Sequence, residues 1–159
     1  MKAKLLTLNS MEDTENLAKE LAPLLENQVV FLMGTLGSGK TTFVRHLVAE
    51  LPGGGNAEVA SPSFTLCNIY PTTPEVLHYD LYRLPPGSHD ESLEEALDKI
   101  ENSLGGASSE KLALLVEWAE NMPEILVPDN RLEIYWHILP KGREVIIKGV
   151  GDAAKLPIF

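Results

Sequence analysis

Residues 34–41 read Gly34-Thr35-Leu36-Gly37-Ser38-Gly39-Lys40-Thr41 and match the pattern G-x-x-x-x-G-K-[ST] at every fixed position. An uninterrupted apolar run, Val29 to Met33, leads directly into this stretch, and an amphipathic segment from Lys40 to Leu51 leads out of it. The apolar run predicts a buried, parallel strand, and the amphipathic segment predicts a helix. A phosphate-binding loop requires this strand–loop–helix context, so the residues predict such a loop rather than a chance glycine-rich turn.

The residue types in this loop indicate how it would hold a phosphate. Glycines let successive backbone N–H groups approach an anion without clashes from Cβ atoms, and the N-terminus of the following helix adds partial positive charge. The side chain of Lys40, which we expect to point at solvent or ligand, would reach the β- and γ-phosphates, and the hydroxyl of Thr41 would ligate Mg²⁺. The loop residues expected to bind a nucleotide are Gly34, Leu36, Gly37, Ser38, Gly39, Lys40, Thr41 and Thr42.

Two acidic residues follow apolar strands and are candidates for a second metal ligand, because phosphate-loop enzymes place an acid at the end of a neighbouring strand. Glu117 ends the run Leu112 to Val116, and Asp80 ends the run Val76 to Tyr79. Both acids are candidate Mg²⁺ ligands beside the loop threonine and candidate catalytic residues beside the loop lysine. The residues alone leave open which acid holds the metal and which positions water.

Two neighbours of these acids have simpler interpretations. A lone histidine in an apolar strand is more often part of the strand face than a ligand, and this is the interpretation of His78. Trp118, directly after Glu117, is more typical of core packing, although aromatic rings also pack at such crevices.

Length, composition and charge limit the class of protein. A chain of 159 residues with 44% hydrophobic and 23% charged residues is expected to form one α/β domain over residues 1–159. The formal net charge of −10 argues against direct binding of DNA or tRNA. The one cysteine, Cys67, excludes an internal disulfide and favours a reducing, cytoplasmic setting. No apolar run approaches the length of a transmembrane helix, so no membrane association is expected.

The remaining pattern predicts a mixed sheet. Ser10 and Asp13 resemble a capping box at the start of a helix, and two alternating segments joined by Pro140-Lys141-Gly142 predict a hairpin. We therefore expect a P-loop NTPase fold whose mostly parallel sheet is closed by a C-terminal antiparallel hairpin. Strands are expected at residues 5–8, 28–33, 61–70, 76–82, 112–117, 132–139 and 143–150, with helices from residue 10, at 40–51 and at 90–104.

Absent motifs narrow the choice among phosphate-loop proteins. The chain has no Asn-Lys-x-Asp stretch for reading guanine and no Asp-x-x-Gly after the loop, which disfavours a regulatory GTPase and leaves ATP (or ADP) with Mg²⁺ as the expected ligand. Small-molecule and nucleotide kinases use several arginines to hold the transferred phosphoryl group. This chain has four, at positions 45, 83, 131 and 143, and they do not cluster in the sequence. A small-molecule kinase and a nucleotide-dependent scaffold with incidental hydrolysis remain the alternatives to an ATPase.

Four segments occur together in a characteristic order: Met33 to Arg45, Ser61 to Thr65, His78 to Leu84, and Leu115 to Trp118. Together they resemble the TsaE (YjeE) family, small bacterial ATPases of tRNA threonylcarbamoyladenosine synthesis. The resemblance covers nearly the whole chain, including Gly142-Arg143 in the hairpin. The phosphate loop alone is generic, whereas the set of four segments is specific.

The resemblance implies a role and a partner. TsaE-like proteins bind and hydrolyse ATP while docked on a TsaB–TsaD pair, which transfers the threonylcarbamoyl group to tRNA. A protein that acts on this pair would contact tRNA only indirectly, in agreement with the acidic charge. Because no obvious arginine finger is present, we expect slow hydrolysis by the isolated protein and faster hydrolysis with the partner.

The resemblance also implies roles for particular residues. Thr41 and Glu117 would hold Mg²⁺, and Asp80 would lie beside the γ-phosphate or a water on the metal. Residues Ser61 to Thr65 would form a mobile, switch-like loop near the nucleotide, and the segment 9–14 would border the adenine. The residues expected on the adenine side are Met11 and Thr14.

Overall fold

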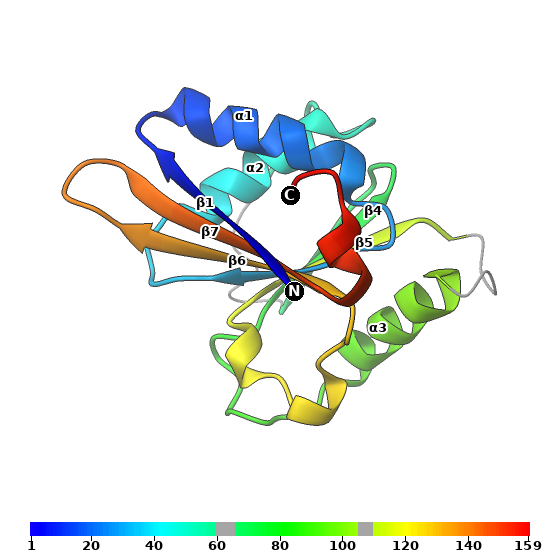
Figure 1. The fold of residues 1–159 in the computed structure, drawn as a ribbon. Helices are drawn as coiled ribbons and strands as arrows, with labels where there is room; N and C mark the ends of the chain where they lie inside the picture. Colours follow the sequence, from blue (N-terminus) through cyan, green and yellow to red (C-terminus); the bar gives the residue numbers. More distant parts are fainter. Residues whose placement is uncertain (60–65, 105–109) are drawn as a thin grey trace.

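A seven-stranded mixed sheet organises the chain, whose computed structural model describes residues 1–59, 66–104 and 110–159 (Figure 1). The strands are β1 (Lys2–Leu8), β2 (Val29–Met33), β3 (Cys67–Tyr70), β4 (Glu75–Asp80), β5 (Leu112–Glu117), β6 (Arg131–Ile138) and β7 (Arg143–Val150). Their order in the sheet is β1-β7-β6-β2-β5-β4-β3. β6, β2, β5 and β4 are parallel, whereas the pairs β6–β7, β1–β7 and β3–β4 are antiparallel. The predicted mostly parallel P-loop NTPase sheet with a closing hairpin is confirmed.

Helices cover both faces of this sheet (Figure 1). They are α1 (Met11–Leu21), α2 (Lys40–Glu50) and α3 (Glu91–Leu104), with 3₁₀ helices at Ala22–Leu24, Ala119–Asn121, Glu124–Leu126 and Gly151–Lys155. α1 and α2 pack on one face and α3 on the other. The 3₁₀ helices were not predicted, because such short turns show too little periodicity to be recognised in a sequence. In the described part of the chain no helix is long and apolar enough to cross a membrane.

The position of β2 between these two layers explains its unbroken apolar run. Val30 and Leu32 pack into the core under α1 and α2, whereas Val29 and Phe31 pack into the core under α3. Successive residues of a strand point to opposite faces of the sheet. A strand covered on both faces is therefore apolar at every position, and the loop that follows it is anchored at the centre of the molecule.

Side-chain caps set where two of the helices begin. The side chain of Ser10 accepts a hydrogen bond from the N–H of Asp13 at 3.2 Å, as the capping box predicts. The Asp13 carboxylate accepts the N–H of Asn9, one residue before the N-cap, at 2.8 Å. Asp90, predicted as the first residue of a helix, instead caps α3 by accepting the N–H of Leu93 at 2.9 Å.

The end of β4 places both candidate acids at one edge of the sheet. The strand was predicted to reach Tyr82 but ends at Asp80, because the Asp80 carboxylate accepts the N–H of Tyr82 at 3.0 Å and turns the chain. Asp80 lies opposite Glu117 in the β4–β5 pairing, and Glu117 lies opposite Leu32 in the β2–β5 pairing. The carboxyl ends of these parallel strands therefore bring the acids beside the loop that leaves β2.

Outside these regions, β1 is longer than the predicted residues 5–8, because it pairs with β7 from Lys2 onward. The predicted loop Ser61–Thr65 and the first part of the predicted strand 61–70 lie outside the described residues.

Candidate nucleotide-binding site

Three glycines give the loop between β2 and α2 its shape. Gly34, Gly37 and Gly39 have φ angles of +147°, +76° and +113°, in a region that residues with a Cβ atom rarely adopt. A Cβ atom at Gly34 would lie 2.8 Å from the carbonyl oxygen of Trp136 and 2.8 Å from Oγ of Ser38. The loop therefore lies directly on β6, and its glycines are required by both conformation and close approach.

The side chain of Lys40 lies inside the site. The residue is only 6% exposed, its Nζ donates a hydrogen bond to the carbonyl oxygen of Gly34, and Nζ lies 5.1 Å from the centroid of the Trp118 ring. The side chain does not point at solvent, because a carbonyl group and an aromatic face both attract the ammonium group; that it points at a ligand stays a prediction. An ammonium group has three N–H donors, so the bond to Gly34 does not exhaust its capacity for a phosphate.

Trp118 forms an aromatic wall of the site as well as packing against the core. The residue has a φ of +57°, which is unusual for a bulky side chain and typical of functional sites. Its ring centroid lies 4.9 Å from that of Tyr82. The half-buried indole therefore stands between the exposed Tyr82 ring and the ammonium group of Lys40, so its interpretation as a core residue is incomplete.

Glu117 is buried and held by a histidine that the sequence analysis assigned to the strand face. His78 Nε2 lies 2.7 Å from Glu117 Oε2, and the two side chains are 0% and 4% exposed. The Tyr70 hydroxyl lies 3.5 Å from His78 Nδ1. With the carboxylate as acceptor, Nε2 carries the hydrogen and donates it, so the histidine fixes the orientation of the carboxylate. His78 does lie on the strand, and its interpretation as a strand-face residue leaves out only this contact.

The donor set of the site fits Mg²⁺. Asp80 is 8% exposed and Glu117 is 3% exposed, and the two carboxylates end neighbouring strands. Thr41, in the first turn of α2 after the phosphate loop, is partly buried. Within the described ranges no three His, Cys, Asp or Glu side chains gather around a common point. Mg²⁺ is usually held by one or two carboxylates together with water and substrate phosphates, and oxygen donors are the ligands that it prefers. Glu117, Asp80 and Thr41 could supply those donors.

One polar atom of the loop has no partner among the described residues. Ser38 is 1% exposed, and its Oγ makes no hydrogen bond. Buried polar atoms without a partner are uncommon, since the cost of leaving one unpaired is about 1–3 kcal/mol. The orphaned hydroxyl in the middle of the loop therefore fits a site that is completed by a polar ligand.

A cavity of about 290 Å³ extends from this loop to the N-terminus of α1. It brings Met11 and Thr14, the residues predicted on the adenine side, together with part of the loop. Leu36 is 69% exposed and does not line it, and neither do Gly34, Lys40, Thr41 or the two acids. The lining residues are Leu8, Asn9, Ser10, Met11, Thr14, Gly37, Ser38, Gly39, Thr42, Trp136, Gly142 and Arg143.

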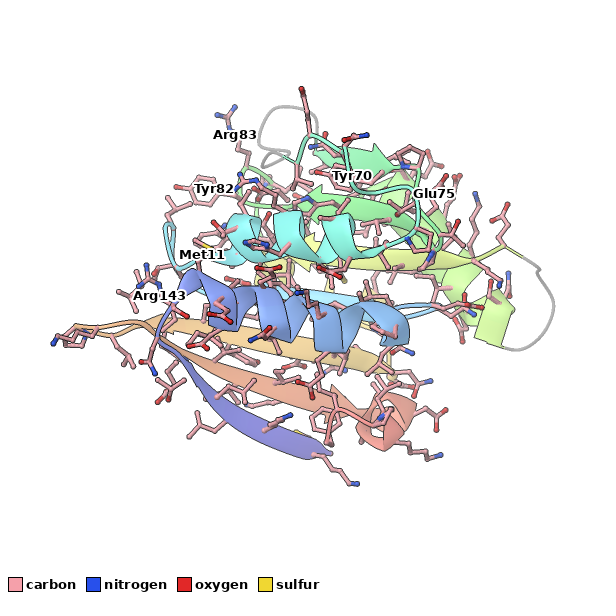
Figure 2. The ribbon with its side chains drawn as sticks, turned by 90° about the horizontal axis from the view of Figure 1, so that it is seen from above. Met11, Tyr70, Glu75, Tyr82, Arg83 and Arg143 are labelled. Atoms are coloured by element: carbon pink, nitrogen blue, oxygen red, sulfur yellow. The ribbon has the colours of Figure 1, made fainter. Side chains whose placement is uncertain are left out.

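Arg143 is the residue of this region that the sequence analysis missed. It was counted among four arginines without a cluster, yet its Nε donates a hydrogen bond to the carbonyl oxygen of Ser38 at 3.0 Å. Figure 2 shows Arg143 and Met11 at the same end of the molecule as Tyr82. The pair Gly142-Arg143, at the tip of the hairpin, is the sequence signal that could have drawn attention to it.

Comparisons with known proteins bear on the identity of the chain. The family described as "Threonylcarbamoyl adenosine biosynthesis protein TsaE" matches residues 8–145. The "tRNA threonylcarbamoyladenosine biosynthesis protein TsaE" of Rickettsia typhi is 37% identical over 143 residues, which cover 87% of this chain and 90% of that protein. The protein of the same name from Aquifex aeolicus is 45% identical over 96 residues, which cover 59% of this chain and 72% of that protein.

A solved structure shares the fold. The crystal structure of YdiB from Bacillus subtilis superposes with a TM-score of 0.70 at 26% sequence identity, and the match covers 97% of this chain and 90% of that chain. The fold, the phosphate loop and the match over residues 8–145 agree with the resemblance found in the sequence. The chain belongs to the TsaE family.

Proposed function

We propose that this protein binds ATP with Mg²⁺ and hydrolyses it in support of threonylcarbamoyladenosine modification of tRNA. One arrangement carries the proposal: a loop built on three positive-φ glycines lies at the same sheet edge as a buried lysine and two buried carboxylates. Family membership supports the pathway, because the names of the relatives refer to threonylcarbamoyladenosine biosynthesis. The single cysteine supports the cytoplasm as the compartment.

The residues of the site would have different roles in the transfer of a phosphoryl group to water. Backbone N–H groups of the loop and the ammonium group of Lys40 would bind the phosphates and stabilise the charge that develops on them. Thr41, Glu117 and Asp80 would hold Mg²⁺, which neutralises phosphate charge when bound. Met11 and Thr14 would border the adenine in the cavity beside the loop.

The two carboxylates differ in their surroundings. Glu117 has one oxygen fixed by His78 at 2.7 Å, so its other oxygen is directed by the same bond and suits a metal ligand. Asp80 accepts a backbone N–H of the following turn at 3.0 Å. This difference favours Glu117 as the principal metal ligand and leaves Asp80 to orient water or to complete the metal shell.

A partner is proposed to complete the catalytic site. Two arginines are not directed at a transferred phosphoryl group: Arg45 is exposed on α2, and the guanidinium group of Arg143 is directed at backbone carbonyls. Transition-state cations supplied in trans raise rates by about 10³–10⁵ in known phosphoryl-transfer systems. We propose the TsaB–TsaD pair as the partner that raises the rate, with tRNA contacted only indirectly.

The test compares binding with turnover. ATP binding is measured by calorimetry with and without Mg²⁺, and phosphate release is measured for the protein alone and with a purified TsaB–TsaD pair. We expect Mg²⁺-dependent binding, slow release alone and faster release with the pair. Fast release alone that does not change on adding the pair would contradict the proposal.

A second pair of measurements separates the alternatives. Transfer of labelled phosphate to a small molecule instead of water would indicate a kinase. A scaffold would be indicated if an Asp80→Asn variant that binds ATP without hydrolysing it supported tRNA modification by the TsaB–TsaD pair as well as the unchanged protein.

A further inference from the structure

Arg143, the first residue of β7, joins the hairpin to the phosphate loop through its guanidinium group. Nε donates to the carbonyl oxygen of Ser38 at 3.0 Å, and Nη2 lies 3.5 Å from the carbonyl oxygen of Gly37. Nη1 donates to the carbonyl oxygen of Gly142 at 2.9 Å. The first two contacts cross about two thirds of the sequence and meet consecutive peptide groups of the loop.

The fold fixes where this arginine stands. Arg143 pairs with Leu8 of β1 on one side and with Ile138 of β6 on the other. Gly142, just before it, has a φ of +77°, and a Cβ atom there would lie 2.4 Å from the carbonyl oxygen of Leu8. The hairpin turn can therefore lie against the end of β1 only with glycine at this position, and the close packing leaves the arginine little freedom at its backbone.

The bond to Ser38 determines the direction of the next N–H group. A trans peptide group is planar, so its C=O and N–H point in opposite directions. When Arg143 holds the Ser38 carbonyl toward the hairpin, the N–H of Gly39 is turned away from the hairpin. A phosphate loop depends on N–H groups that converge on the anion while their carbonyls point outward. The bond from Arg143 therefore favours the orientation of the Gly39 N–H group that anion binding requires.

We propose that Arg143 is a positioning residue that holds the phosphate loop in its anion-binding shape, so that the hairpin helps to set nucleotide affinity. The inference rests on the proposed binding of a nucleotide by this loop. It assigns Arg143 to the backbone of the loop rather than to the transferred phosphoryl group, because Nε and Nη1 are hydrogen-bonded to carbonyl oxygens and Nη2 faces a third.

The experiment uses the full chain with Arg143→Gln, Arg143→Lys and a matched control. Arg131→Gln is the control, because Arg131 also belongs to the hairpin and donates to a backbone carbonyl, that of Pro128 at 2.8 Å, at the opposite end of β6. Affinities for ATP and ADP are measured by calorimetry. Amide chemical shifts of Gly37 and Gly39 are measured by NMR in the nucleotide-free protein, and thermal melts confirm folding.

We expect Arg143→Gln to weaken ATP and ADP binding about tenfold or more, since a hydrogen bond from a charged donor typically contributes that much. Arg143→Lys should recover only part of the loss, because a lysine supplies charge without the forked donors. Arg131→Gln should stay within about twofold of the unchanged protein. The Gly37 and Gly39 amide signals should move in Arg143→Gln and not in Arg131→Gln.

Three outcomes would overturn the inference: unchanged affinity in Arg143→Gln, full recovery in Arg143→Lys, or loop amide signals that do not move. Full recovery by lysine would mean that charge alone matters. If the unchanged protein binds no nucleotide, the proposed function fails, whereas the amide signals still decide whether Arg143 holds the loop.

Discussion

Polar side chains in two regions of the sheet differ in how deeply they are buried and in how completely they are hydrogen-bonded. On the surface of β6, Arg131 Nε lies 2.7 Å from Glu133 Oε2, and the Tyr135 hydroxyl donates to Glu133 Oε1 at 2.6 Å. These groups are half-buried and pair within one strand. At the carboxyl edge of the parallel strands, polar groups are buried; one of them, Ser38 Oγ, has no partner, and another, Glu117, is held by His78 of the neighbouring strand. The buried polar residues of the described chain that lie at this edge are Ser38, Lys40, His78, Asp80 and Glu117. Thr72 is also buried but lies elsewhere.

The difference separates polar groups that stabilise the fold from polar groups that serve a ligand. The β6 network finds its partners in the strand and in the residues next to it, so it needs no ligand. The edge cluster contains an orphaned hydroxyl at Ser38, a left-handed Trp118 and a lysine placed over an aromatic ring. Buried, incompletely paired polar groups cost stability and persist where function requires them. Four predictions test this contrast, in order of decreasing expected effect.

Lys40→Ala is expected to have the largest effect on nucleotides. Loss of a cation directed at phosphate typically costs several kcal/mol in the transition state, so ATP hydrolysis should fall at least about 100-fold. The protein should still fold, because alanine favours a helix and its introduction removes a buried charge. Phosphate release and a thermal melt measure the two effects. Hydrolysis at the unchanged rate by a folded Lys40→Ala variant would rule out the phosphate-loop assignment.

Glu117→Ala should weaken Mg²⁺-dependent ATP binding more than Asp80→Ala does. The reason is that Glu117 adjoins β2 directly and is held by His78, whereas Asp80 lies one strand farther from the loop. Calorimetric titrations of ATP with and without Mg²⁺ compare the two variants. If Asp80→Ala abolishes the Mg²⁺ dependence and Glu117→Ala leaves it intact, the two roles are exchanged.

His78→Leu should weaken Mg²⁺-dependent binding about 10–100-fold, which is the usual cost of losing a group that orients a metal ligand. His78→Gln, whose amide can donate to the same carboxylate, should recover part of the affinity. Replacement of the exposed His89 by glutamine is the matched control, since that residue lies outside the site. Equal losses in His78→Leu and His78→Gln would mean that the ring packs the core and does not orient Glu117.

Glu133→Gln should have the smallest effect and should not change ATP binding. Burial alone would raise the pKa of Glu133, but hydrogen bonds from Tyr135 and Arg131 outweigh it and lower the pKa below the usual 4.5. A lowered pKa in the folded state contributes stability above about pH 4.5 that is lost as the pH falls through the folded value. Denaturant melts should show about 1 kcal/mol less stability at pH 7 in the variant, and a smaller difference near pH 3. A large loss of ATP affinity would contradict the conclusion that the β6 network stabilises the fold without serving a ligand.

The sequence predicted the parts of the site that are contiguous in the chain. The run Val29 to Met33, the glycines after it and the helix from Lys40 lie within one short window, so their periodicity and residue types indicate the loop. Glu117 and Asp80 could be found because strand ends in a parallel sheet share an edge. Their position at that edge could be predicted from the order of the strands and helices alone.

The missed features are contacts between distant residues. His78 and Glu117 are 39 positions apart, and Arg143 and Ser38 are 105 positions apart. No local pattern reports which side chains the strand register will bring together. The burial of Lys40 was missed for the same reason, because the ring that covers it belongs to Trp118, at the end of β5.

Trp136 connects the phosphate loop to the cooperative unfolding of the whole molecule. Its backbone oxygen and its Cβ would lie 2.8 and 3.3 Å from a Cβ atom built on Gly34, and its own ring is 5.1 Å from that of Phe43 in the core. The start of the loop at Gly34 is therefore fixed to the core, whereas the exposed residues Thr35, Leu36 and Gly37 can move without it. A protein that loses its core would lose its phosphate-binding shape in the same step.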